Sequence, residues 1–183
     1  MANSATVLTG RNNIFTVRHA DGDLLCRIKG KVLELEERAY NPLAPGDLVL
    51  LEDIDLANGS AVIAGRMTRK NEFGRYNHKR DSIQTLAANI DQVVCLMSVH
   101  QPAYRRRFVD RVLVLCEYYE IPATIIVTKS DLAPNDAASH IRELSDLGYA
   151  ARATSITAGD TRQTGMADGC SHRPRQRHEL AGT

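Results

Sequence analysis

A four-residue stretch that follows an apolar run has the residue types that a guanine-binding site requires. Thr128, Lys129, Ser130 and Asp131 fit the pattern [N/T]-K-x-D and come directly after the apolar residues 125–127. Guanine offers two neighbouring donors, the ring N1–H and the exocyclic N2–H₂, and one carboxylate accepts from both. We expect Asp131 to accept these bonds and reject adenine. Lys129 is expected to lay its stem along the base or to connect neighbouring loops, and Thr128 to hold the loop through its hydroxyl. The alternative is an exposed loop in which Asp131 is only a local cap.

A second candidate segment follows the next predicted strand. Thr154, Ser155 and Ile156 end the run that begins near Tyr149. Ligands of parallel α/β sheets bind at the carboxyl ends of the strands, so this segment and Asp131 belong at one edge. We expect its backbone N–H groups to face the guanine O6. An ordinary loop is the alternative.

Basic residues gather in a short central stretch of the sequence. From residue 66 to residue 80 there are six basic side chains and one acidic one, Glu72, with aromatic residues between them. Such a surface binds phosphates and stacks on the bases of single-stranded RNA. A solvated linker is the alternative, and the cluster 105–107 is equally open between a polyanion-binding and a solvated face. The candidate RNA-binding residues are Arg66, Arg69, Lys70, Arg75, Tyr76, Lys79 and Arg80.

The elements that must position these residues fall into two groups. Short strands separated by turn residues predict a small antiparallel barrel or sandwich in the first part of the chain. The segment 31–39 is undecided between a helical turn and an extended arm. After a polar bridge, continuous apolar runs alternate with helical spacing, which predicts a parallel α/β sheet. The first β segment is expected within 7–17, and the further expected strands are 24–28, 48–54, 61–67, 93–97, 123–127 and 149–154. The expected helices are 105–119 and a second one capped by Asn135 or Asp136 and ending at Leu147.

Bulk properties narrow the class of protein without naming a partner. The net charge is +1, so global charge identifies no binding partner. The four cysteines form no C-x-x-C pair, which favours a reducing, cytoplasmic compartment. No leader pattern and no apolar stretch of the ~20 residues that span a bilayer is apparent. Beyond about residue 160 periodicity disappears and we expect an irregular, disordered tail, whose Cys170, His172 and His178 match no standard metal spacing.

Residues 7–160 resemble the RsgA/YjeQ family of circularly permuted GTPases. The resemblance implies an OB-fold barrel followed by a partial α/β GTPase sheet in which the guanine-reading motif precedes the phosphate loop. It also implies a cytoplasmic monomer that binds guanine nucleotide with Mg²⁺, hydrolyses GTP, and acts on the small ribosomal subunit and its rRNA during late maturation. The residues that carry it are Gly10, 15–17, 26–31, 45–47, 69–72, 86–93, Pro102, 108–114 and 128–132.

The sequence also departs from the family pattern. No G-x-x-x-x-G-K-[S/T] stretch occurs, so the backbone nest and lysine that hold phosphates are missing, as are the family's zinc ligands. We therefore expect a frameshift or premature stop relative to a full-length gene, and no GTP turnover by this chain alone. A non-catalytic RNA-binding module and a non-functional remnant are the alternatives. The expected organisation is an OB-fold domain over 1–68, a basic linker over 69–89, a partial GTPase domain over 90–160 and the tail 161–183.

Overall fold

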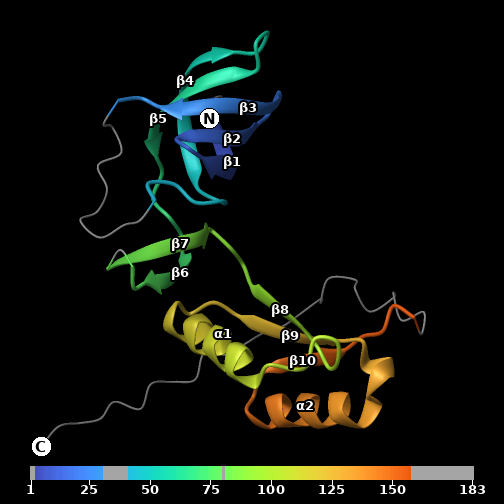
Figure 1. Cartoon of the computed structure of the whole chain (residues 1–183). Coiled ribbons are helices and arrows are strands. Elements are labelled where there is room, and N and C mark those ends of the chain that lie inside the picture. Colours follow the sequence, from blue (N-terminus) through green and yellow to red (C-terminus); the bar gives the residue numbers. More distant parts are fainter. Residues whose placement is uncertain (1–2, 31–40, 80, 158–183) are drawn as a thin grey trace, which may run out of the picture. The chain divides into compact units, whose positions relative to one another are not determined.

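A computed structural model describes residues 3–30, 41–79 and 81–157, and the chain divides at Asp91 into two compact units (Figure 1). The undecided segment 31–39, the predicted tail 161–183 with its Cys170, His172 and His178, and the candidate Arg80 lie outside the described residues. Each unit is described by itself.

The first unit contains a closed five-stranded barrel, which confirms the predicted fold class. Its strands follow the spatial order β1-β2-β3-β5-β4, and β1 closes the barrel by pairing antiparallel with β4. β3 and β5 pair in parallel. Parallel neighbours cannot be joined by a hairpin turn, and the chain between these two strands includes β4. The bounds are β1 Ser4–Arg11, β2 Ile14–His19, β3 Gly22–Ile28, β4 Leu48–Asp55 and β5 Ser60–Arg66.

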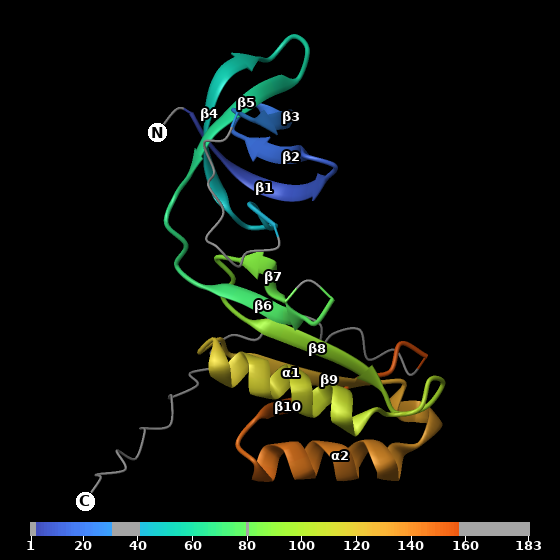
Figure 2. The same ribbon diagram turned by 60° about the vertical axis from the view of Figure 1, so that its left-hand side comes forward.

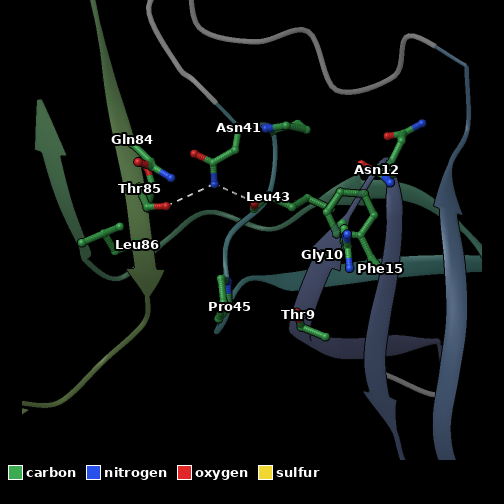
Figure 3. A pocket seen from close by; sticks show the side chains of 13 residues that line it. Thr9, Gly10, Asn12, Phe15, Asn41, Leu43, Pro45, Gln84, Thr85 and Leu86 are labelled. Atoms are coloured by element: carbon green, nitrogen blue, oxygen red, sulfur yellow. Dashed lines mark hydrogen bonds between the residues drawn. The ribbon is translucent and has the colours of Figure 1, made fainter. Parts of the chain in front are cut away.

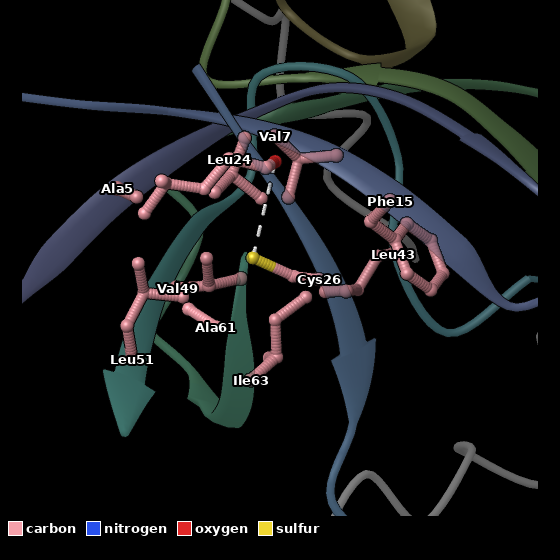
Figure 4. Close-up of a cluster of buried hydrophobic side chains, with 11 residues drawn as sticks. Ala5, Val7, Phe15, Leu24, Cys26, Leu43, Val49, Leu51, Ala61 and Ile63 are labelled. Carbon is pink, nitrogen blue, oxygen red and sulfur yellow. Dashed lines mark hydrogen bonds between the residues drawn. The ribbon is translucent and has the colours of Figure 1, made fainter. Parts of the chain in front are cut away.

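The barrel interior is filled by side chains that alternate along each strand (Figure 4). Successive strand residues point to opposite faces, so Val7, Val17, Val49 and Ile63 are buried while their neighbours face outward. Cys26 lies among them as a free thiol whose pKa is raised by burial, so it behaves as a small apolar group.

A hairpin of two strands, β6 (Glu72–Asn77) and β7 (Ser82–Ala88), follows the barrel in the same unit. The sequence analysis predicted no strand here, because polar and charged residues interrupt the apolar alternation. A main-chain contact and a side-chain contact join the hairpin to the segment before β4. The Ala88 N–H donates to the Pro45 carbonyl (2.9 Å), and the side-chain Nδ2 of Asn89 donates to the Gly46 carbonyl (2.8 Å). The hairpin is therefore joined to the barrel by a peptide group of Ala88 and by the side chain of Asn89.

A buried ion pair reinforces the same junction. Asp47 is fully buried, and its carboxylate accepts bonds from Arg69 Nε (2.7 Å) and Nη2 (2.8 Å). It also accepts the backbone N–H of Ala44 at 2.8 Å. Arg69 reaches Glu72 of β6 at 2.5 Å, so one guanidinium connects the start of β4 with the hairpin. These bonds, Asp47 first, raise the pKa of Arg69 and keep it charged.

The second unit is a parallel sheet in the order β10-β9-β8, and helices connect its strands along the chain (Figures 1 and 2). Both crossovers step across the sheet in the same direction, so right-handed connections place α1 and α2 on one face. The other face leaves Val94 and Leu96 of β8 46% and 63% exposed. The bounds are β8 Val93–Ser98, α1 Arg106–Tyr118, β9 Ala123–Thr128, the 3₁₀ turn η1 Ser130–Leu132, α2 Pro134–Asp146 and β10 Ala150–Ala153.

The helices of this unit pack their apolar stripes on the sheet. Val109 and Leu113 of α1 and Leu144 of α2 contact Cys95 and Ile125. The predicted cap of the second helix, Asn135 or Asp136, was wrong. α2 begins at Pro134, because proline is suited to the first helical turn. The residue before it, Ala133, makes no side-chain cap bond. None of the helices in residues 3–30, 41–79 and 81–157 has the length and apolar character that a membrane crossing requires.

Candidate functional site

The two segments singled out for guanine recognition meet at the carboxyl edge of the parallel sheet. β9 ends at Thr128, and the chain leaving β10 returns to it through the Thr154 N–H, which donates to the Val127 carbonyl at 2.9 Å. The Ser130 N–H then donates to the Thr154 carbonyl at 3.2 Å. Because neighbouring parallel strands end at the same edge, loops that are distant in sequence become adjacent there.

The Asp131 carboxylate is held by two hydroxyl groups from the segment after β10. Ser155 Oγ donates to Oδ1 at 2.5 Å, and Thr157 Oγ1 donates to Oδ2 at 3.1 Å. Ser155 is buried, with 3% of its surface exposed, whereas Asp131 is exposed. The Ser155 bond is the main reason that the pKa of Asp131 lies below its ordinary value, so the group is an anion at neutral pH. Each carboxylate oxygen keeps acceptor capacity for a further donor.

Lys129 connects neighbouring loops, which is one of the two roles expected for it from the sequence. Its backbone is left-handed, at φ 56° and ψ 38°, and its Nζ donates to the carbonyl of Gln101 in the loop after β8. Gln101 also has a positive φ of 51°. The lysine therefore ties the loops after β8 and β9 together at the same edge of the sheet.

The structure brings some predicted guanine-site residues together and leaves others apart. Asp131 and Ser155 are in contact, and Thr128 is half-buried where β9 ends. Ile156 is 85% exposed and has no described role. Thr157 was missed, and its only signal was a hydroxyl two residues beyond a segment already chosen.

The described residues at this edge include an anchored carboxylate and no cluster of metal ligands. Within the described ranges, no group of three or more His, Cys, Asp or Glu side chains could hold a metal ion. The sequence also lacks the Ser or Thr of a phosphate loop that would ligate Mg²⁺ beside a nucleotide. The residues present therefore do not fit the Mg²⁺ of a nucleotide, and the guanine contacts expected of Asp131 stay a prediction.

The candidate RNA-binding residues are spread over the end of β5, the following segment and the hairpin. Arg75, Tyr76 and Lys79 are exposed on the hairpin. Arg69, by contrast, has a side chain only 14% exposed, with carboxylates as its partners. Lys70 pairs with Asp91 at 3.2 Å, and both side chains are exposed. The exposed members are the ones available to phosphates.

Comparisons with known proteins agree on one group of relatives. The family model described as RsgA GTPase matches residues 66–166. A protein of Borreliella burgdorferi (strain ZS7) named small ribosomal subunit biogenesis GTPase RsgA is 36% identical over 153 residues, which is 82% of this chain and 49% of the relative. A protein of the same name from Cytophaga hutchinsonii is 34% identical over 148 residues, 78% of this chain and 48% of the relative. The chain thus spans about half the length of these curated relatives.

Solved structures give the same result for the fold. The crystal structure of YjeQ from Thermotoga maritima matches with a TM-score of 0.63 and 28% identity, over 86% of this chain and 53% of that one. YloQ, described as a circularly permuted GTPase, matches with a TM-score of 0.57 over 84% of this chain and 51% of that one. At 21% identity, the second match bears on the fold alone.

Proposed function

The chain belongs to the RsgA family of GTPases, and from that membership we propose that it acts in maturation of the small ribosomal subunit. In this proposal the second unit binds the guanine of GTP or GDP, with Mg²⁺ and hydrolysis supplied by parts of the family protein that this sequence does not contain. The first unit binds rRNA. The site of action is the cytoplasm, where ribosomal subunits mature.

The observation that carries the guanine assignment is the anchored Asp131 carboxylate. Hydroxyls of Ser155 and Thr157 fix both of its oxygens in direction, and the lowered pKa keeps it ionised. A fixed anion at the carboxyl edge of a parallel sheet suits the adjacent N1–H and N2–H₂ donors of guanine. Adenine presents no such donor pair, so the same carboxylate disfavours it.

We predict that Asp131→Asn weakens GDP binding by at least about tenfold, since hydrogen bonds to a charged group contribute about 1.5–3 kcal/mol each. The asparagine also exchanges one acceptor for a donor, so the variant should gain affinity for xanthosine diphosphate, which has a carbonyl at C2. Binding is measured by titrating backbone amide NMR signals of 128–131 with millimolar GDP, ADP and xanthosine diphosphate.

Asp136→Asn is the matched control for this prediction. Asp136 is exposed in the first turn of α2 and makes the same change in charge away from Ser155. It should bind GDP as the unmodified chain does. Equal binding of ADP and GDP, or equal losses in the two variants, would contradict the guanine assignment. GTP turnover should stay at the background rate throughout, because no phosphate loop is present in residues 1–183.

The RNA assignment is supported by the exposed basic and aromatic side chains of the hairpin. Arg75, Tyr76 and Lys79 project from one two-stranded element, and Lys70 lies just before it. Tyr76 is half-exposed and forms an edge-on contact with His78, which gives the surface an aromatic group for base stacking. A binding module without nucleotide control would use this same surface, so the measurements of GDP and RNA binding separate the two functions.

Reversing the charge of Lys70, Arg75 and Arg80 should weaken binding to small-subunit rRNA and flatten its salt dependence. Each lost phosphate contact on a single strand removes about 0.7 from the slope of log K against log salt. Fluorescence anisotropy at several salt concentrations measures both quantities. Reversal of Arg142 and Arg152, which are exposed in the second unit, is the control and should leave the slope unchanged. The same slope in both variants would count against the hairpin as the RNA surface.

A further inference from the structure

Three polar side chains form a closed ring at the carboxyl edge of the parallel sheet. Ser155 Oγ lies 2.5 Å from Asp131 Oδ1, Thr157 Oγ1 lies 3.1 Å from Asp131 Oδ2, and the two hydroxyl oxygens are 3.3 Å apart. A hydroxyl group has one proton, and here each hydroxyl gives its proton to a different carboxylate oxygen. The two oxygens of Asp131 are therefore held by different residues.

The two hydroxyl groups differ in how firmly the fold holds them. Ser155 is buried, and its segment is bound to β9 by the Thr154 N–H, which donates to the Val127 carbonyl at 2.9 Å. Thr157 is exposed, as Asp131 is. A carboxylate that is fixed at one oxygen alone can still turn about that contact, and the turn displaces the other oxygen most. The direction of Oδ2 therefore depends on Thr157.

The order of polar groups on guanine matches them to the two oxygens. Along the edge of the base, O6 is followed by the N1–H and then by the N2 amino group. The backbone of 154–156 is expected to face O6, and Ser155 of that segment holds Oδ1. The N1–H, beside O6, then donates to Oδ1, and the amino group donates to Oδ2. Each carboxylate oxygen can accept a second bond, so the Thr157 hydroxyl and the amino group can share Oδ2.

We infer that Thr157 is a positioning residue that sets the preference of this site for guanine over hypoxanthine, the base that lacks the 2-amino group. Its hydroxyl holds Oδ2 toward the amino group, while Ser155 holds Oδ1 toward the N1–H. The inference rests on the guanine binding proposed above and deepens it, since the residue lies outside the stretch 128–131. Hypoxanthine makes only the N1 bond, so its binding does not depend on Thr157.

Guanosine diphosphate and inosine diphosphate test this inference, because they differ only in the 2-amino group. In NMR titrations of the full chain, the guanine nucleotide should bind at least about tenfold more tightly, as expected for one hydrogen bond to a charged group. Thr157→Val keeps the shape of the side chain and removes the hydroxyl. It should weaken binding of the guanine nucleotide at least about fivefold and leave binding of the inosine nucleotide unchanged. Equal weakening of both, or an unchanged ratio, would overturn the inference.

Two control variants separate the hydroxyl from the rest of the side chain. Thr157→Ser keeps the hydroxyl and should keep the preference for guanine. Thr9→Val makes the same change at an exposed threonine of the first unit, which lines the pocket drawn in Figure 3. It should leave both affinities as they are in the unmodified chain. Loss of the preference in either control would count against the Thr157 hydroxyl.

A measurement without nucleotide tests the contact itself. The Ser155 bond is the main cause of the lowered pKa of Asp131, and the Thr157 bond and the charge of Lys129 also lower it. Thr157→Val removes a donor to the ionised form, so the pKa of Asp131 should rise. The signal of the Asp131 carboxyl carbon, followed by NMR as the pH is changed, measures this pKa.

The outcomes distinguish the two levels of the proposal. An unchanged pKa of Asp131 in Thr157→Val would overturn the Thr157 contact. If the unmodified chain binds guanosine diphosphate and Thr157→Val keeps the ratio of the two affinities, the inference fails while guanine binding stands. If the unmodified chain does not bind guanosine diphosphate, both fail.

Discussion

Replacing Asp47 with alanine should lower the free energy of unfolding of the first unit by about 3–5 kcal/mol, the usual cost of removing one partner from a buried ion pair. Asp47 is fully buried and receives both Nε and Nη2 of Arg69. Alanine would leave this guanidinium, 14% exposed, without its main counter-charge. It would also leave the Ala44 N–H without its acceptor. Most of this loss comes from leaving the Arg69 guanidinium and the Ala44 N–H buried without partners, and less from the lost attraction between Asp47 and Arg69.

The matched control is a second Arg–Asp pair in the same barrel. Arg18 Nε and Asp23 Oδ1 lie 3.0 Å apart, but their side chains are 65% and 46% exposed. Water solvates both charges after either is removed, so Asp23→Ala should cost less than about 1 kcal/mol. Both pairs join an arginine Nε to an aspartate Oδ1, at 3.0 Å and 2.7 Å, so the comparison of the two variants isolates the effect of burial on stability.

Hydrogen exchange of backbone amides, resolved by residue, measures both variants. The chain has two units, so a single unfolding curve would not report on one of them. Protection should fall in β1–β5 of Asp47→Ala and remain in β8–β10. Equal losses for Asp47→Ala and Asp23→Ala would show that the buried network contributes no more than a surface pair.

Gly46→Ala should release the hairpin from the barrel and cost about 3 kcal/mol or more. Gly46 has a φ of +89°, which an L-residue adopts only under strain of about 1–3 kcal/mol. A Cβ built at this position would lie 2.0 Å from the carbonyl oxygen of Ala88. That carbonyl cannot retreat easily, because the Ala88 N–H is bonded to Pro45 and the next residue, Asn89, is bonded to the Gly46 carbonyl. The backbone strain at Gly46 and the overlap of the new Cβ with the Ala88 carbonyl oxygen both lower the free energy of unfolding.

Gly59→Ala separates the two contributions. Its φ of +61° imposes a similar backbone strain, but nothing lies within 4 Å of the Cβ that would be added. We expect a loss of about 1 kcal/mol there, from conformation alone. In exchange measurements, the amides of β6 and β7 should lose protection in Gly46→Ala and keep it in Gly59→Ala. A hairpin that stays protected in both variants would contradict this account of the junction.

The fold was predictable where local pattern and burial agree. The apolar residues of 48–54, bounded by turn residues, predicted a barrel strand, and the segment 123–127 predicted a buried strand. The run 93–97 was expected to be covered on both faces, and this was wrong, because Val94 and Leu96 are 46% and 63% exposed. The hairpin β6–β7 was not predictable in this way, because polar and charged residues interrupt its apolar alternation. Its end is joined to Pro45 and Gly46, more than 25 residues earlier in the chain. Such contacts leave no periodic trace in the strands that make them.

The residues of the candidate site also divide into those that local pattern identified and those that it did not. The sequence identified Asp131 and Ser155 because each follows an apolar strand, and parallel topology then places them together. It did not identify Thr157 or Gln101, whose contributions depend on how the loops bend after the strands end. The guanine and RNA roles of the chosen residues stay predictions that the binding measurements above address.

The way in which the hairpin is seated has a consequence for how its surface can diverge. Ala88 contributes its peptide N–H, and Pro45 and Gly46 contribute peptide carbonyls. The side chain of Asn89 and the Asp47–Arg69–Glu72 network complete the attachment. Outward positions such as Arg75, Tyr76 and Lys79 are not part of that attachment. Substitutions at these exposed positions leave the junction bonds intact, so the side chains on this face can change without loss of the attachment.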